Sequence, residues 1–333
     1  MNSRERVLTA FEHQEPDRVP LFEAWIETEI VNALSGDPYI AREKLGLDCM
    51  PLGSHPKNTR AYGDGVDEWG RVFINGHYHS GLIQSEEALE QYTAPLSHAQ
   101  DWFPSKKIQE IKQKYSEEYV LYFGWHDCSL GLTYLRMGIE NFFRSLYEDP
   151  ELVRVIIERS SEWTIALIEQ ANQNEVDFLI LGDDAAENSR PLISPKLFRE
   201  LILPEYKKIV KASDVPVIWH SDGHITPLLP MIIEAGFTGI HSLEPKANID
   251  LADIKSLYGN KLVLAGNLDT TEILCQPDLD LVRKDVERCI KQGAPGGGYL
   301  FSSSNSLFEG HNIKTILEAY EHAKKMGKYP IGF

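Results

Sequence analysis

Short runs of strand-forming apolar residues recur along this chain, and most are separated by segments whose apolar residues have helical spacing. The apolar runs are Val19–Phe22, Leu47–Leu52, Tyr119–Trp125, Val176–Leu181, Val215–Trp219, Phe237–His241, Leu262–Ala265 and Tyr299–Phe301. The helical segments include Pro150–Ala171, Pro195–Lys211, Leu228–Ala235 and Ile313–Met326. This alternation is typical of βαβ units and a parallel sheet. Because eight such strands close a barrel, we predict a single α/β domain over residues 1–333, a (β/α)8 TIM barrel.

One long insertion, between Gly53 and Glu118, interrupts the alternation. Within it, the pair Asn75-Gly76 lies between alternating segments, which is a strong signal for a two-residue hairpin turn. We therefore predict a β-hairpin over Val66–Ile83 (about residues 66–83), outside the barrel wall and near its mouth.

Charge and composition exclude several classes of partner. The chain has 33 basic and 50 acidic residues, and its net charge of -17 would repel nucleic acid. No apolar run approaches the roughly 20 residues of a membrane-spanning helix, and the segment Met1–Phe11 is too charged for a signal peptide. The four cysteines form no CxxC pair and indicate no disulfide framework. We expect a cytoplasmic protein that binds neither nucleic acid nor membrane.

The apolar runs end in polar residues that can do chemistry. In a barrel the ends of all strands converge on one face, where barrel enzymes place their active sites. Individually such residues often have structural roles, since an Asp after a strand can cap the next helix and a lone His can be a packing residue. The adjacent acids Asp183-Asp184 and the three histidines favour an active site. The strand-end residues are Glu23, His126, Asp127, Asp183, Asp184, Glu187, His220, Asp222, His224, His241, Glu244, Asn267, Asp269 and Ser302–Asn305.

Motifs along the whole chain resemble those of the uroporphyrinogen decarboxylase-like superfamily. They include Arg4-Glu5-Arg6-Val7-Leu8, Glu15-Pro16-Asp17-Arg18-Val19-Pro20, Asp67-Glu68-Trp69-Gly70, Leu192-Ile193-Ser194-Pro195, His220-Ser221-Asp222-Gly223, Leu264-Ala265-Gly266-Asn267-Leu268-Asp269 and Gly296-Gly297-Gly298-Tyr299. The resemblance implies a (β/α)8 barrel, in agreement with the strand count, and a monomer or a homodimer. It also implies one of two activities. One is cofactor-free decarboxylation of uroporphyrinogen, and the other is zinc-dependent methyl transfer to or from a corrinoid (cobalamin) on a partner protein.

This chain departs from the family motifs at two places, and each departure bears on one of these activities. The true decarboxylases carry an Arg-rich N-terminal signature that grips substrate carboxylates, whereas the matching region Phe22–Glu27 has two acids and no arginine. This argues against uroporphyrinogen as the substrate. The methyltransferases bind zinc through a His-x-Cys pair and a later Cys. His220 matches that His, but Asp222 and Asn305 stand where the two cysteines would be. His, Asp and Asn can nevertheless hold Zn²⁺ or a harder cation.

These considerations assign an expected role to each candidate residue. His220 and Asp222 should form the core of the site, with Asn305 opposite. An alternative is that Asp222 only caps the helix from His224 onward. As catalytic residues we expect Asp183, Glu187, His220, Asp222 and His241; as substrate-binding residues Glu23, Trp25, His126, His224 and Asn305; and as metal ligands His220, Asp222 and Asn305.

The hypothesis that follows is a corrinoid-dependent methyltransferase. It would move a methyl group between a small methylated compound, such as a methoxylated one, and a corrinoid on a partner protein. Electrophilic activation at His220 and Asp222, with Zn²⁺ as the metal the resemblance implies, would assist the transfer. The alternatives are a decarboxylase or other lyase acting on a small carboxylated substrate, and a non-catalytic barrel that binds a small molecule or a corrinoid protein.

Overall fold

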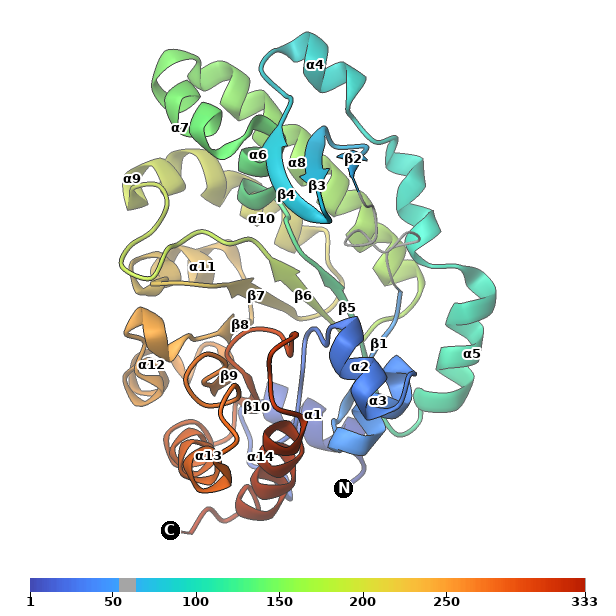
Figure 1. Ribbon diagram of the computed structural model, residues 1–333, viewed down its shortest axis with the longest axis vertical. Coiled ribbons are helices and arrows are strands. Elements are labelled where there is room, and N and C mark those ends of the chain that lie inside the picture. The colour runs from blue at the N-terminus through green and yellow to red at the C-terminus, as the bar shows by residue number, and fades with distance from the viewer. Residues whose placement is uncertain (54–63, 333) are drawn as a thin grey trace.

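Most strands of the chain form one curled parallel sheet with helices around it (Figure 1). The computed structural model describes residues 1–53 and 64–332. Within these ranges seven parallel strands pair in the order β1-β5-β6-β7-β8-β9-β10. Their bounds are β1 Cys49–Pro51, β5 Val120–Trp125, β6 Phe178–Gly182, β7 Val217–Ser221, β8 Gly239–Ser242, β9 Val263–Leu268 and β10 Tyr299–Ser303. The parallel sheet predicted from the alternating pattern is confirmed, and these strands overlap seven of the eight predicted runs.

The helices predicted at Pro150–Ala171, Leu228–Ala235 and Ile313–Met326 are present with small shifts of their ends. The segment Pro195–Lys211 is irregular, because Phe198–Ile202 is π-helical and Pro204 has no amide proton to donate within the helix. No helix in residues 1–53 and 64–332 is both long and apolar enough to span a membrane. The bounds are α1 Ser3–Phe11, α2 Thr28–Leu34, α3 Pro38–Leu45, α4 Glu86–Gln91, α5 Ser105–Tyr115, α6 Leu130–Met137, α7 Ile139–Glu148, α8 Pro150–Gln173, α9 Pro195–Leu197, α10 Leu203–Lys211, α11 Leu229–Ala235, α12 Leu251–Tyr258, α13 Leu279–Gly293 and α14 Ile313–Met326.

The core explains why the strands read as unbroken apolar runs. Phe178 and Ile180 of β6 pack in a cluster with residues from the other strands, such as Ile218. Leu179 and Leu181, which alternate with them, belong to the larger cluster that includes the surrounding helices. Since both faces of the sheet are buried, neither face selects for polar residues.

The predicted first strand, Val19–Phe22, is not a regular strand. Its backbone is hydrogen-bonded on one side to Phe301 of β10 and on the other to Asp48, whose amide donates to Leu21 O at 2.8 Å. Only an isolated bridge, Leu21 to Phe301, forms there. Pro20 has no amide proton, and the Leu21 amide donates to the Asp48 carboxylate instead of to a neighbouring strand. The segment therefore lies between β10 and β1 without forming a ladder.

The predicted hairpin turn is present in the insertion. β3, Arg71–Ile74, pairs antiparallel with β4, His77–Gly81, across Asn75-Gly76. Both turn residues have positive φ, 51° and 74°, as a two-residue hairpin turn requires. A short third strand, β2, Gly65–Val66, pairs with β3. The hairpin packs on α6, where Tyr78 Oη donates to Leu135 O at 3.0 Å.

Candidate functional site

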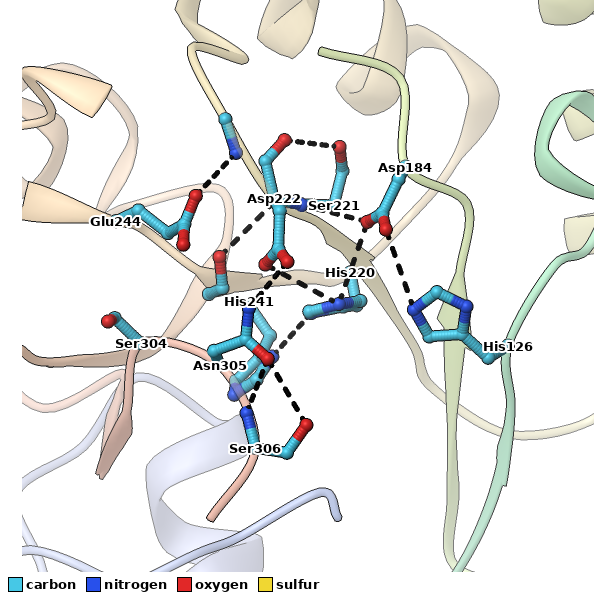
Figure 2. A network of polar contacts seen from close by, with 12 residues as sticks. His126, Asp184, His220, Ser221, Asp222, His241, Glu244, Ser304, Asn305 and Ser306 are labelled. Carbon is cyan, nitrogen blue, oxygen red and sulfur yellow. Dashed lines mark hydrogen bonds and ion pairs between the residues drawn. The ribbon is translucent and has the colours of Figure 1, made fainter. Parts of the chain in front are cut away.

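Polar side chains from three neighbouring strands meet in one cluster (Figure 2). His126 follows β5, Asp184 follows β6, and His220 lies in β7. Because Gly182 pairs with His220 across the sheet, the chain that continues from β6 brings Asp184 beside His220. One ligand-type atom from each of His126, Asp184 and His220 lies within 4.8 Å of the others. The structure thus brings together His126 and His220, as expected from the sequence, and adds Asp184, which was recognised as a strand-end residue but assigned no role.

A chain of hydrogen bonds behind His220 determines which ring nitrogen carries its proton. His220 Nδ1 lies 2.7 Å from His241 Nδ1, and His241 Nε2 lies 3.1 Å from Ser302 Oγ. The Ser302 hydroxyl donates to Ser303 O at 2.7 Å, so His241 Nε2 must donate and His241 Nδ1 must accept. Burial lowers the pKa of both histidines well below its usual value, so both rings are neutral. His220 Nδ1 therefore carries the proton, and His220 Nε2 presents a lone pair to the cluster.

Asp222 places a second carboxyl group, besides that of Asp184, close to His220 Nε2. Its Oδ1 lies 3.7 Å from His220 Nε2, and its backbone amide donates to Asp184 Oδ1 at 3.0 Å. Its Oδ1 is shielded from solvent and has no hydrogen-bond partner in the described parts of the chain. Burial, together with the negative charges of Asp184 and Glu244, raises the pKa of Asp222 to about 8. Within the described residues, no hydrogen bond thus joins His220 Nε2 to the carboxyl groups of Asp184 and Asp222.

Asn305 holds Asp222 and does not offer a ligand atom. Its Nδ2 donates to Asp222 Oδ2, while its Oδ1 accepts from the amide and the hydroxyl of Ser306 at 2.7 and 3.1 Å. The Ser306 amide can only donate, so the amide oxygen of Asn305 must face it. An amide nitrogen has no lone pair for a metal, so in this orientation Asn305 offers no ligand atom to the cluster, and its predicted role as a metal ligand stays a prediction. The carboxylate of Asp222 is held by this side chain, which does not fit the helix-capping alternative.

A series of ion pairs connects His126 to the hairpin and holds its ring in place. His126 Nδ1 lies 3.0 Å from Asp127 Oδ1, and Asp127 Oδ2 accepts from Arg71 Nη1 at 2.8 Å. Arg71, in β3, also donates to Asp67 at 2.7 Å. Burial lowers the pKa of His126, but Asp184 and Asp127 outweigh it and raise the pKa to about 10. Asp127 adopts a left-handed backbone, φ 65°, a costly conformation that clusters at functional sites. Sequence reasoning missed Arg71, because only tertiary contacts connect the hairpin to His126.

Trp25 forms an apolar wall beside the histidines. Its ring centroid lies 4.9 Å from that of His220 and 5.4 Å from that of His126, both in edge-to-face geometry. The structure places Trp25 at the cluster, and its role in binding substrate stays a prediction.

Asp183 has a structural role at the start of α6, and its predicted catalytic role stays a prediction. Its fully buried carboxylate accepts hydrogen bonds from the amides of Ser129, Leu130 and Gly131 at the start of α6, and from Tyr206 Oη at 2.7 Å. Burial raises the pKa of Asp183 to about 6, although these donors oppose the rise. Adjacent residues of an extended segment point to opposite sides, so Asp184 faces the cluster and Asp183 faces the helix.

Glu187 and His224 are also directed away from the cluster, against expectation. Glu187 is exposed and accepts from Arg190 Nε at 2.8 Å within a tight turn, in which its amide donates to Arg190 O. His224 Nδ1 lies 2.9 Å from Ala247 O. Glu187 lies in the loop after β6 and His224 in the loop after β7, and the His224 amide donates to Glu187 O at 2.8 Å.

Glu23 was expected to bind substrate, but it fastens the first segment to the last strand. It is fully buried, and its Oε1 accepts from the Ser303 amide at 2.6 Å and from Tyr320 Oη. Ser303 Oγ lies 2.9 Å from Glu23 Oε2 and 3.0 Å from Asn305 O. Burial raises the pKa of Glu23 to about 7, although the hydrogen bonds lower it. A protonated Glu23 can donate to Ser303 Oγ, which then donates to Asn305 O, so the neutral acid satisfies all these groups.

We expect the variant Glu23→Gln to be more stable than the wild type at pH 8 and equally stable at pH 5. The amide mimics the neutral acid, with its nitrogen donating to Ser303 Oγ. Between the ordinary pKa of 4.5 and the folded pKa of about 7, the folded state holds a proton that the unfolded chain releases. This contribution is full below pH 4.5 and is lost as pH rises through 7. The expected gain at pH 8 is about 1–3 kcal/mol, read from urea unfolding. A gain at both pH values, or at neither, would contradict a protonated Glu23.

Comparison with known proteins identifies relatives of the whole fold. The profile of the family described as uroporphyrinogen decarboxylase (URO-D) matches residues 85–326. A methylated-thiol–coenzyme M methyltransferase of Methanosarcina mazei is 27% identical over 47% of this chain and 41% of its own length. A uroporphyrinogen decarboxylase of Shewanella piezotolerans is 22% identical over 51% of this chain and 47% of its own length. The chain thus spans about half the length of the curated relatives it matches.

Among solved structures, a methyltransferase from Methanosarcina mazei has the same fold. The superposition has a TM-score of 0.76 and covers 98% of this chain and 99% of the other, with 16% sequence identity. The whole described sheet and its helices therefore have a counterpart in that enzyme.

Proposed function

Since the chain belongs to the uroporphyrinogen decarboxylase family, we propose that it moves a methyl group between a small methylated compound and a corrinoid (cobalamin) carried by a partner protein. The sequence likeness to a methylated-thiol–coenzyme M methyltransferase of Methanosarcina mazei supports methyl transfer, and a methyltransferase structure from the same organism shares the fold. A bound corrinoid would supply the cobalt centre that exchanges the methyl group.

The charges around the cluster argue against a porphyrinogen substrate. Asp184 and Glu244 place negative charge near Asp222, and this charge would repel a substrate that carries several carboxylates. The guanidinium of Arg71 is already paired with Asp67 and Asp127. A small neutral or cationic methylated compound fits these charges better.

The observation that carries the proposal is the lone pair of His220 Nε2, which faces Asp222 Oδ1 and Asp184 Oδ1 at 3.7 and 3.8 Å. A cation held here, Zn²⁺ or a harder divalent ion, would polarise the heteroatom that carries the methyl group and stabilise it as a leaving group. His241 would keep the His220 ring in its orientation, and Trp25 would exclude water from one side. Because carboxylates replace thiolates, an oxygen-bound methyl group is the favoured substrate.

We also propose that the sheet is the wall of a single (β/α)8 barrel domain. Pro20–Phe22 would occupy the place of the eighth strand, because its backbone bonds both β10 and β1. The β3–β4 hairpin would then lie near the mouth of the barrel, where Arg71 reaches Asp127.

Incubation with cob(I)alamin tests the proposed function. The purified protein is mixed with cob(I)alamin and a panel of methoxylated compounds and methylamines, and the cobalamin spectrum is followed. We expect enzyme-dependent loss of the cob(I)alamin absorption with at least one methoxylated compound. No loss with any compound would contradict methyl transfer, and release of CO2 from small carboxylic acids would then favour the lyase alternative.

A further inference from the structure

Three ligand-type atoms in the cluster face one another, and no hydrogen bond joins them within the described residues. His220 Nε2 lies 3.8 Å from Asp184 Oδ1 and 3.7 Å from Asp222 Oδ1, and both distances are too long for hydrogen bonds. Asp222 Oδ1 has no hydrogen-bond partner in the part of the chain that the structure describes, and the nearby Ser242 hydroxyl lies 3.3 Å from Ser221 O, to which it donates. A buried carboxylate oxygen without a donor is costly unless a cation neutralises it.

Both histidines of the cluster are held through Nδ1. The carboxylate of Asp127 can only accept, so His126 Nδ1 must donate to it. His220 Nδ1 donates to His241, as the chain of hydrogen bonds from Ser302 requires. Metal-ligating histidines have this arrangement in general, because the partner of the second ring nitrogen fixes the tautomer and the ring orientation. Each ring is thus oriented to offer Nε2 to the same space.

The spacing of these atoms suits a single ion. Ligands at about 2.1 Å from a tetrahedral zinc ion lie about 3.4 Å from one another. The distance from His126 Nε2 to Asp184 Oδ2 is 3.8 Å, so all three measured pairs exceed this value by only a few tenths of an ångström. The side chains of Asp184 and Asp222 are 30% and 29% exposed, so one side of the cluster is open to solvent and to a further ligand.

From this geometry we propose a divalent-cation site whose ligands are His126 Nε2, the Asp184 carboxylate, His220 Nε2 and Asp222 Oδ1, with Asp127 and His241 as positioning residues. Two of these ligands, His126 and Asp184, follow β5 and β6 and lie outside the sequence motif His220-Ser221-Asp222. Two imidazoles and two carboxylates suit Zn²⁺, Co²⁺ or Mn²⁺ and do not require thiolates. The site is defined without substrate or corrinoid, so it can be tested separately from methyl transfer.

Titration with Co²⁺ tests the site directly. The protein is stripped with a chelator, and Co²⁺ binding is followed by the visible d–d absorption and by metal content after gel filtration. We expect one Co²⁺ per chain, which Zn²⁺ displaces. The variants His126→Gln and Asp184→Asn should each weaken Co²⁺ binding more than about 100-fold, because losing a ligand costs more than losing an outer partner. The exposed controls His79→Gln and Asp101→Asn remove the same groups elsewhere and should bind like the wild type.

The positioning residue Asp127 provides a second readout. Asp127→Asn should weaken Co²⁺ binding about 10–100-fold and shift the d–d bands. Its melting curve without metal should fall only partly, because the amide keeps an acceptor for Arg71 but loses the charge of the buried pair. Absence of stoichiometric binding in the wild type, or wild-type affinity in both His126→Gln and Asp184→Asn, would overturn the site. A protein that binds one Co²⁺ through these residues but transfers no methyl group would support the site and contradict the proposed function.

Discussion

His220→Ala is expected to lower kcat/KM for methyl transfer to cob(I)alamin by about 10²–10⁴-fold, the range typical of a group that activates the reacting atoms. His220 is buried at the centre of the cluster, and its Nε2 is the atom that both Asp184 and Asp222 face. Removing the ring takes away Nε2, the nitrogen that the hydrogen bond between His220 Nδ1 and His241 orients toward the two carboxyl groups. Asp222→Ala should have an effect of similar size, because it removes the oxygen opposite Nε2.

The controls for this prediction separate chemistry from folding. His79→Ala removes an exposed imidazole of the hairpin and should leave kcat/KM within about two-fold of the wild type, as surface substitutions away from such features usually do. Thermal melts should show that His220→Ala and Asp222→Ala remain folded. If both variants are folded and keep wild-type rates, the active site lies elsewhere.

Asp48→Ala is expected to lower the free energy of unfolding by about 3–5 kcal/mol, the cost of removing one partner from a buried ion pair. The Asp48 carboxylate is fully buried and accepts from Arg6 Nη1 at 2.7 Å and from Arg18 Nη1 at 2.8 Å. It also accepts from the Leu21 amide at 2.8 Å and from Ser3 Oγ at 2.6 Å. The substitution removes the acceptor that two guanidinium groups and an amide share, at the point where Pro20–Phe22 bridges β10 and β1. Arg6 keeps its ion pair with Asp17, and Arg18 keeps its hydrogen bond to Val19 O.

Calorimetry checks this prediction. For a chain of 333 residues the change corresponds to a fall in Tm of about 4–7 °C. Asp48→Asn, which keeps an acceptor but loses the charge, should be intermediate. Glu175→Gln, which removes a carboxylate paired with Lys112 at the surface, should leave Tm unchanged. An Asp48→Ala protein with the wild-type Tm would show that this carboxylate does not hold the two ends of the sheet together.

The periodicity of the sequence was sufficient to predict the parallel sheet, most of its strands and the hairpin turn. Strands buried on both faces must be apolar throughout, and Asn75-Gly76 suits the positive φ of its turn, so these features are local and readable. The ends of parallel strands meet at one edge of a sheet, which is why His126, His220 and Asp222 could be expected on one face. The prediction of a regular strand at Val19–Phe22 was wrong, because Pro20 has no amide proton and the Leu21 amide donates to the carboxylate of Asp48 instead of to a neighbouring strand.

Only the tertiary structure decided which strand-end residues face the cluster. Asp183 and Asp184 are adjacent and chemically identical, yet one accepts the amides at the start of α6 and the other lies beside His220. Likewise, the Ser306 donors determine the orientation of the Asn305 side-chain amide, and in that orientation its oxygen does not face the cluster. The sequence determines the chemistry of each side chain. A shift of one position along an extended segment, however, reverses the direction in which the side chain points. That direction depends on hydrogen bonds to residues distant in the chain, which the pattern of one strand does not contain.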